Sequence, residues 1–235
     1  MTLTPDRLIA HRGDQSRFPE NTLDSIKAAL NAGAIYVETD VQLSRESTPF
    51  LFHDREMTRL TGQPGHVHQL SDHKISQRRI HETYSIPDLS AACDLLRQYP
   101  KATLFIEAKR IAIDHFGVET MFRRISDTVG SLKNRCPLIS FSLPFVKHAQ
   151  HAGWPLTGAI FDRKSPPGPL FGKEGEALDY VFMEIGLYRN HPQWRFADSR
   201  LALYETSDPE LANELLNQGV GLIETNVFGK FTRHA

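Results

Sequence analysis

The chain has 235 residues, of which 40% are hydrophobic and 23% are charged, and its formal net charge is −1. This near-neutral balance excludes the global positive field that draws a protein to nucleic acid or anionic lipid, so an anionic ligand would need a local positive site. No apolar run in the sequence approaches the roughly 20 residues that a membrane span requires.

Short apolar runs alternate with helical patterns along the whole chain, and this order predicts an α/β fold with a parallel sheet, either open or closed into a barrel. The expected strands are Leu8–Ala10, Tyr36–Val41, Phe50–His53, Thr103–Glu107, Leu138–Phe141, Thr157–Phe161, Tyr180–Ile185, Arg200–Tyr204 and Gly221–Glu224. The expected helices are one capped by Asn21 or Thr22 and ending at Asn31, one opened by Pro87 and running to Gln98, and His115–Gly130, Pro144–His151 and Pro209–Gln218. These are more strands than the eight positions of a closed barrel, so at least one is miscounted.

Two stretches break the alternation. The interval between Asp40 and Phe50 is too short for a helix and its loops, so we expect an extended connection there. Residues 54–85 are polar and rich in His, Gly and Gln, which predicts a small insertion or lid over one end of the sheet. With this insertion, residues 1–235 are expected to form a single domain.

The two cysteines, Cys93 and Cys136, lie in apolar contexts that predict buried thiols. The first residues of the chain show neither the basic nor the apolar region of a secretory leader. Together these features predict a cytoplasmic protein.

Polar side chains directly follow the first expected strand. His11 and Arg12 come after Ala10, and Pro19–Thr22 follows a few residues later. In a parallel barrel, this position is the carboxyl-terminal mouth, where functional sites are built. A lone histidine is more often structural, so His11 acquires a chemical role only together with other groups.

The second expected strand ends in two carboxylates, Glu38 and Asp40, which share a face because strand side chains alternate. Two carboxylates on one face of a buried strand repel each other and are costly to desolvate, and a shared divalent cation removes both costs. Oxygen ligands favour Mg²⁺ or Ca²⁺ over zinc. The alternative is a solvated strand end with its own lysine or arginine partner.

Two further strand ends carry ionisable groups. His53 and Asp54 end one apolar run, and Glu107 and Lys109 share a face at the end of another. Glu107 would add a carboxylate for the cation and Lys109 a fixed positive charge for an anion, although the two residues would also make an ordinary salt bridge. All these groups together suit phosphoryl transfer, in which a cation and basic side chains neutralise a phosphodiester while two imidazoles move protons.

These motifs, in this order and spacing, resemble those of the glycerophosphodiester phosphodiesterase family. The motifs are His11–Gly13, Pro19–Thr22, Glu38–Asp40, His53–Asp54 and Glu107–Lys109. The similarity continues more loosely to the end of the chain, and the short polar stretch after His53 resembles that of the small bacterial cytoplasmic members. The resemblance implies a (β/α)8 TIM-type barrel with an insertion after the third strand. It also implies metal-dependent hydrolysis of glycerophosphodiesters to an alcohol and glycerol 3-phosphate.

The resemblance further implies a role for each matched side chain. One divalent cation, Mg²⁺ or Ca²⁺, would be held by Glu38, Asp40 and Glu107. The acid/base pair would be His11 and His53, with His11 favoured as base. The phosphate would be bound by Arg12 and Lys109, and the ring of Tyr204 would contact the substrate. Glu20 and Asn21 would brace the first loop.

The sequence departs from the family pattern at three places. Many relatives have Trp/Tyr-Thr-Val-Asn where this chain has Tyr204-Glu205-Thr206-Ser207, Thr-Asp where it has Thr225-Asn226, and Asp-Gly where it has Glu46-Ser47-Thr48. The changes at Glu205 and Ser207 bear on the choice of alcohol rather than on the phosphodiester chemistry.

Two other functions remain open at this point. A related barrel phospholipase, of the D or C type, also uses two histidines and carboxylates at a barrel mouth, but His11–Gly13 together with Pro19–Thr22 argues against it. A non-catalytic glycerophosphodiester-binding protein would have no use for the complete set of reactive groups. The leaving alcohol, the attacking group (water or the glycerol 2-hydroxyl) and the oligomeric state also stay open.

Overall fold

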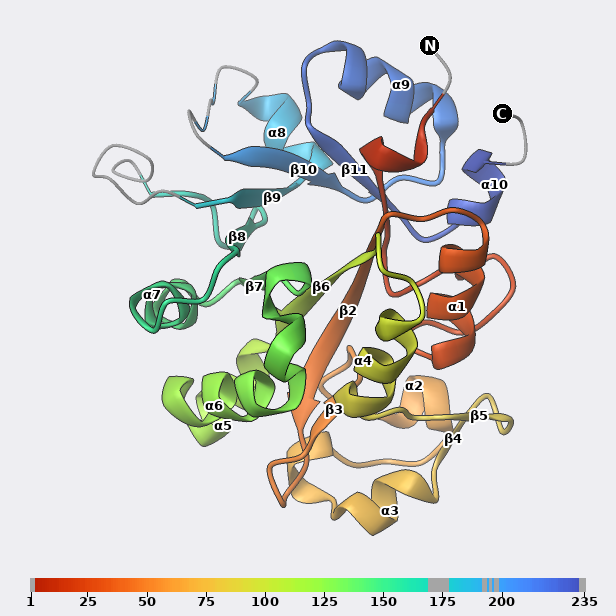
Figure 1. Ribbon diagram of the computed structural model, residues 1–235, viewed down its shortest axis with the longest axis vertical. Helices are drawn as coiled ribbons and strands as arrows, with labels where there is room; N and C mark the ends of the chain where they lie inside the picture. Colours follow the sequence, from red (N-terminus) through yellow and green to blue (C-terminus); the bar gives the residue numbers. More distant parts are fainter. Residues whose placement is uncertain (1–2, 169–177, 192–193, 195, 197–198, 233–235) are drawn as a thin grey trace.

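The computed structural model describes residues 3–168, 178–191, 194, 196 and 199–232. Within these residues, eight parallel strands form a closed barrel (Figure 1). They are β1 (Leu8–Ala10), β2 (Tyr36–Leu43), β6 (Thr103–Ala108), β7 (Leu138–Ser140), β8 (Thr157–Phe161), β9 (Tyr180–Glu184), β10 (Arg200–Tyr204) and β11 (Leu222–Thr225). The barrel closes because β1 pairs with both β2 and β11. The expected (β/α)8 barrel is thereby confirmed.

One of the nine expected strands is not a barrel strand. The run Phe50–His53 contains β3 (Pro49–Leu51), which pairs antiparallel with the end of β2, with Leu51 opposite Val41. The chain reverses through a tight turn in which Ser47 has a φ of 63°. An antiparallel hairpin needs only such a short turn, whereas a parallel crossover needs a dozen or more residues. The connection is therefore extended, as expected.

Helices cover the outside of the barrel. They are α1 (Leu23–Asn31), α4 (Leu89–Arg97), α5 (Arg110–Phe116), α6 (Val118–Val129), α7 (Leu143–His151), α8 (Ile185–Asn190), α9 (Pro209–Asn217) and α10 (Phe228–Thr232). Side chains that accept a backbone N–H cap four of them, namely Thr22, Asp88, Ser142 and Asp208. Every described helix is too short or too polar to cross a bilayer.

The expected single helix His115–Gly130 is wrong. The segment belongs to two helices, α5 and α6, because Gly117 between them has a φ of 82° and interrupts the helical backbone. The two short helices α8 and α10 were not expected, since neither is long enough to show a helical period in the sequence.

The barrel interior is filled by apolar side chains, one from each of seven strands. They are Ile9, Phe105, Ile139, Ile160, Phe182, Ala202 and Leu222. Because strand side chains alternate, residues two positions further along these strands also point inward, but at the carboxyl-terminal mouth. Five of the seven residues that this rule gives line a cavity at the mouth: His11, Glu107, Phe141, Tyr204 and Glu224. A separate apolar layer lies between strands and helices, and it includes both cysteines, which are free and buried as expected.

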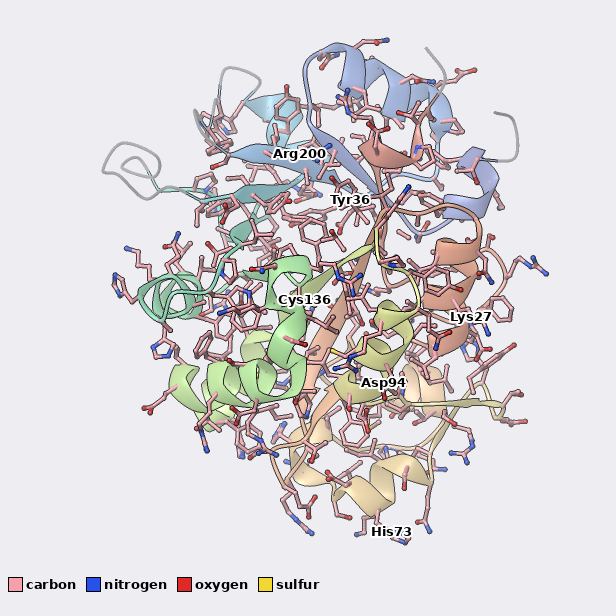
Figure 2. The ribbon with its side chains drawn as sticks, viewed as in Figure 1. Lys27, Tyr36, His73, Asp94, Cys136 and Arg200 are labelled. Carbon is pink, nitrogen blue, oxygen red and sulfur yellow. The ribbon has the colours of Figure 1, made fainter. Side chains whose placement is uncertain are left out.

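At the opposite end of the barrel, Arg200 of β10 contacts both β2 and the start of the chain. Arg200 donates a hydrogen bond to the Tyr36 hydroxyl at 2.8 Å, and its guanidinium lies 5.2 Å from the centre of the Tyr36 ring (Figure 2). The same guanidinium donates to the carbonyl of Asp6. These contacts tie the start of the chain to β2 and β10 at the end away from the mouth.

Residues 54–85 form the insertion, which lies beyond the end of β2 (Figure 1). It contains α2 (Thr58–Thr61), a 3-10 turn at Val67–Gln69, α3 (Asp72–Ser76) and the antiparallel pair β4 (Arg79–Ile80) and β5 (Tyr84–Ser85). Its buried side chains form a small core of their own, separate from the barrel layers: Met57, Leu60, Val67, Ile75 and Ile80, with Phe50, Phe52 and Ile86 from either side.

Candidate active site

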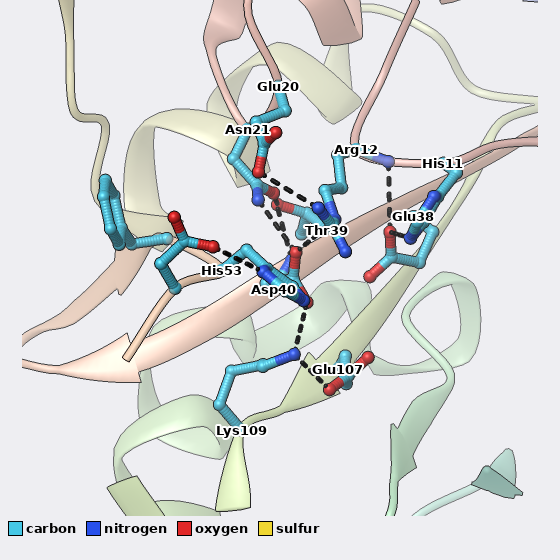
Figure 3. Close-up of polar contacts among 12 residues, drawn as sticks. His11, Arg12, Glu20, Asn21, Glu38, Thr39, Asp40, His53, Glu107 and Lys109 are labelled. Atoms are coloured by element: carbon cyan, nitrogen blue, oxygen red, sulfur yellow. Dashed lines mark hydrogen bonds and ion pairs between the residues drawn. The ribbon is translucent and has the colours of Figure 1, made fainter. Parts of the chain in front are cut away.

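Four of the five motifs supply residues to a cavity of about 160 Å³ at the barrel mouth. The predicted site residues that line it are His11, Arg12, Glu38, His53, Glu107, Lys109 and Tyr204. Asp40 is fully buried and contacts two of them, Arg12 and Lys109 (Figure 3). The structure thus brings the eight predicted site residues together.

Glu38, Asp40 and Glu107 lie together, with one carboxylate oxygen of each within 4.8 Å of the others. Neighbouring strands produce this geometry, since Asp40 on β2 pairs with Glu107 on β6. All three side chains are buried.

Asp40 is the most strongly neutralised of these carboxylates. Its oxygens lie 2.9 Å from Arg12 Nε and 3.0 Å from Lys109 Nζ, and it accepts a 2.8 Å hydrogen bond from Asn21 Nδ2. Burial raises the pKa of Asp40, but Lys109 and Arg12 outweigh burial and hold that pKa well below its ordinary value. Lys109 is also 2.7 Å from Glu107, so both basic side chains are already engaged with carboxylates.

Among the described residues, Glu38 makes no ion pair with either basic side chain, and the nearest imidazole nitrogen, His11 Nε2, lies 3.8 Å away. Its Oε2 accepts the backbone N–H of Arg12 at 3.0 Å, while its Oε1 is buried and has no hydrogen-bond partner among the described residues. Burial, and then the charge of Asp40, raise the pKa of Glu38 well above its ordinary value. A divalent cation fits this arrangement because it would supply the charge that Glu38 lacks and would take the oxygen ligands that Mg²⁺ and Ca²⁺ prefer.

Asn21 is the side chain that organises the acidic cluster. Its amide oxygen accepts from the Thr39 hydroxyl and the Asp40 backbone N–H, and its amide nitrogen donates to the Asp40 carboxylate. Asn21 has a φ of 56°, a conformation that asparagine tolerates better than most residues. The next residue, Thr22, caps α1 in a capping box with Ser25, so the helix fixes the position of this loop.

The loop that carries His11 and Arg12 packs directly on the start of α1. A Cβ atom on Gly13 would lie 2.5 Å from the carbonyl carbon of Ser25, and Gly13 has a φ of 84°. Only glycine permits this close approach. The two N-terminal motifs are therefore one packed unit in which the second positions the first.

The two histidines each present Nδ1 to a carboxylate. His11 Nδ1 lies 2.5 Å from Glu205 Oε2, and His53 Nδ1 lies 2.9 Å from Asp54 Oδ1. The backbone on either side of His53 is held by Gln42 of β2, whose amide donates to the carbonyl of Asp54 at 2.8 Å.

Arg59 of α2 connects the insertion to this site. Its guanidinium contacts Asp54 and both carboxylate oxygens of Glu20, with distances of 2.8 and 2.9 Å to Glu20. Glu20 also accepts from Arg12 at 3.0 Å. The insertion is thus joined by ion pairs to the loop that carries the first histidine.

Tyr204 contributes its ring rather than its hydroxyl to the cavity. The hydroxyl donates a 2.8 Å hydrogen bond to the carbonyl of Phe161. The ring joins Phe141, Phe182 and neighbouring isoleucines in an apolar wall. The cavity therefore has one charged side and one apolar side.

Three site residues were missed from the sequence: Arg59, Glu205 as a partner of His11, and Glu224. Glu224 lines the cavity and is 3% exposed; burial raises its pKa to about 7, and its Oε1 has no hydrogen-bond partner within the described chain. Alternation on the last strand places Glu224 on the inward face with Leu222, so the rule that found Glu38 would have found it. For Arg59, which reaches the site from an irregular insertion, no sequence signal existed.

Comparison with known proteins gives a family match over residues 11–154, to the Glycerophosphoryl diester phosphodiesterase family. A glycerophosphodiester phosphodiesterase from Bacillus altitudinis is 28% identical over 120 residues, which are 48% of this chain and 49% of that protein. One from Caldanaerobacter subterraneus is 42% identical over 60 residues, or 26% of this chain and 25% of that protein. The chain thus spans about half of the length of the first relative and about a quarter of the length of the second.

Solved structures share the fold along nearly the whole chain. An Oleispira antarctica phosphodiesterase, solved in complex with the product sn-glycerol-3-phosphate, matches with a TM-score of 0.82 and 23% identity over 96% of this chain and 94% of that one. A glycerophosphodiester phosphodiesterase from Parabacteroides distasonis matches with a TM-score of 0.82 and 18% identity over 97% of this chain and 95% of that one. At these identities, the likeness shows the fold alone.

Proposed function

Because the chain belongs to the Glycerophosphoryl diester phosphodiesterase family, we propose that it hydrolyses glycerophosphodiesters to an alcohol and glycerol 3-phosphate in a metal-dependent reaction. The observation that carries this proposal is the meeting of Glu38, Asp40 and Glu107 beside two imidazoles at one barrel mouth. The apolar wall opposite these groups suits the carbon skeleton of a small alcohol.

The three carboxylates are the proposed ligands of one cation, Mg²⁺ or Ca²⁺. A bound divalent cation supplies positive charge to the phosphate oxygens and lowers the pKa of a coordinated hydroxyl or water. Arg12 and Lys109 orient the phosphodiester, since both line the cavity and both contact Asp40. Their pKa values are raised because the surrounding carboxylates outweigh burial, so both stay charged.

The two histidines move the protons. His11 takes the proton of the attacking hydroxyl, which is either the glycerol 2-hydroxyl or water, as the new bond to phosphorus forms. His53 gives a proton to the alcohol oxygen as its bond to phosphorus breaks. Attack by the glycerol 2-hydroxyl yields a cyclic phosphate that water then opens with the same two groups. The Tyr204 ring packs against the substrate.

The test is turnover of a panel of glycerophosphodiesters, with choline, ethanolamine, glycerol or inositol as the leaving alcohol. EDTA is expected to abolish turnover, and Mg²⁺ or Ca²⁺ to restore it. His11→Ala and His53→Ala should each lower kcat about 10²- to 10⁴-fold, whereas His73→Ala, at an exposed position of α3, should not.

Four outcomes would contradict the proposal. Turnover that persists in EDTA would exclude a metal requirement. Near-normal turnover in either histidine variant would exclude acid/base catalysis by the two imidazoles. Faster cleavage of intact phospholipid than of glycerophosphocholine would point to a phospholipase, and saturable binding without released alcohol would point to a binding protein. The cytoplasmic location expected from the sequence stays a prediction, to be checked by cell fractionation.

A further inference from the structure

We propose that Glu205 is a positioning residue for His11, and that its carboxylate holds the proton on Nδ1 so that the Nε2 lone pair faces the cavity. This inference rests on the proposed function, in which His11 accepts a proton from the attacking hydroxyl. Nothing in the motif that contains His11 supplies this contact, because Glu205 lies 194 residues away in the sequence.

The contact between the two side chains fixes the tautomer. An ionised carboxylate only accepts hydrogen bonds, so the Nδ1 atom 2.5 Å from Glu205 must carry the proton. The neutral ring then has a lone pair on Nε2. That atom is 3.8 Å from Glu38, which is longer than a hydrogen bond, so it is open to a substrate hydroxyl. Free histidine favours the opposite tautomer, so Glu205 imposes the one that a base at this position needs.

The position of Glu205 is itself determined by the barrel. It follows β10 directly, and the preceding residue, Tyr204, is anchored by the hydrogen bond from its hydroxyl to the Phe161 carbonyl. The Glu205 side chain is 44% exposed while that of His11 is 12% exposed, so the carboxylate reaches in from the rim. The hydrogen bond to His11 lowers the pKa of Glu205 below its ordinary value, which keeps the carboxylate ionised at neutral pH.

The second imidazole is held in the same way. His53 Nδ1 meets Asp54, and Asp54 is in turn bound by Arg59. In each imidazole, a carboxylate at Nδ1 leaves Nε2 as the atom available for proton transfer. His53 obtains its carboxylate from the next residue in sequence, whereas His11 obtains its carboxylate from a different strand.

The test compares Glu205→Ala, which removes the acceptor, with Glu205→Gln, whose amide oxygen keeps an acceptor at nearly the same place. Glu205→Ala is expected to lower kcat about 10- to 100-fold while KM changes less than about threefold, as for residues that orient a reacting group. Glu205→Gln should recover most of that kcat.

The decisive readout is the His11 tautomer, measured by ¹⁵N NMR at a pH where the ring is neutral, with the His11 signal assigned from its loss in His11→Asn. Wild type and Glu205→Gln are expected to carry the proton on Nδ1 and Glu205→Ala on Nε2. Glu184→Ala is the matched control, because Glu184 ends the neighbouring strand β9 but pairs with Arg163; it should leave the tautomer unchanged.

An unchanged His11 tautomer in Glu205→Ala, or a change confined to KM, would overturn the positioning role. The NMR result does not depend on turnover. A tautomer that follows Glu205 in a protein that cleaves none of the diesters would therefore count against the proposed function while leaving the contact between the two residues established.

Discussion

The carboxyl group of Glu224 is buried at the mouth of the barrel, close to the charges of His11 and Glu107. Burial raises its pKa from 4.5 to about 7. The folded protein therefore binds this proton more tightly than the unfolded chain does. The stability that results is fully present below about pH 4.5 and is lost as the pH rises through about 7.

Glu224→Gln removes this pH dependence because an amide does not titrate. Between about pH 5 and about pH 8, the free energy of unfolding of the metal-free variant should fall less than that of wild type, by roughly 1 to 3 kcal/mol. Urea denaturation at both pH values measures the difference. Glu210→Gln, at an exposed position in α9, should follow wild type. Parallel pH profiles for Glu224→Gln and wild type would show that Glu224 is not buried as described.

At the scale of single residues, alternation along strands predicted much of the site. It placed Glu38 with Asp40 and Glu107 with Lys109, and the structure brings these side chains together. It did not predict which carboxylates would be neutralised, because that depends on where Arg12 and Lys109 reach. Nor did it predict the partner of His11, which is set by the closure of the barrel and not by local sequence.

At the scale of elements, the loop from His11 to Thr22 and helix α1 are held together by the close approach at Gly13. Gly13→Ala would add both a strained φ and a contact of 2.5 Å with the Ser25 backbone. We expect it to lower the free energy of unfolding by about 3 kcal/mol or more and to reduce activity, since the loop must move.

Gly33→Ala provides the matched control for this substitution. Gly33 has a φ of 93°, but nothing lies within 4 Å of an added Cβ atom. Gly33→Ala should therefore lower the free energy of unfolding only by the backbone strain, about 1 kcal/mol, and leave kcat unchanged. Urea denaturation and steady-state kinetics of both variants give the comparison. Equal losses of stability would mean that the contact with Ser25 is relieved at no cost.

Elements that depend on a local signal were predicted well, and those that depend on a distant partner were not. The capping residue Thr22 correctly predicted where α1 begins. The run at Phe50 is apolar because Phe50 and Phe52 pack in the insertion core, not because they belong to the barrel. An apolar run indicates burial but does not say against which layer, so the sequence alone overcounted the barrel strands.

At the scale of the whole molecule, the proposed cation would couple its binding to folding, because the unfolded chain does not bring β2 and β6 together. A saturating divalent cation should raise the free energy of unfolding by about 2.7 kcal/mol at a hundredfold excess over Kd. Thermal denaturation with and without Mg²⁺ or Ca²⁺ measures this. In Glu107→Gln, the shift should shrink, whereas Glu119→Gln, at an exposed position in α6, should keep it. A shift of equal size in both variants would exclude a cation at Glu107.

The alternation of strands and helices predicted a parallel sheet, but it predicted neither the closure of that sheet into a barrel nor its register. β1 pairs with β11, so Leu8 lies opposite Ile223, and this pairing joins the two ends of the chain. Such a pairing leaves no local trace in composition or period. The closed barrel was predicted only from the resemblance of the motifs to a known family.

The antiparallel turn between β2 and β3 places three site residues on one folded unit. Glu38, Asp40 and His53 belong to one uninterrupted hairpin, and Gln42 clamps the two arms by donating to the carbonyls of Phe52 and Asp54. Residues 54–85 are attached after this hairpin and carry their own core. Arg59 of this segment still binds Asp54 and Glu20, so replacing residues 54–85 should spare the hairpin but remove the ion pairs that hold the carboxylate beside His53.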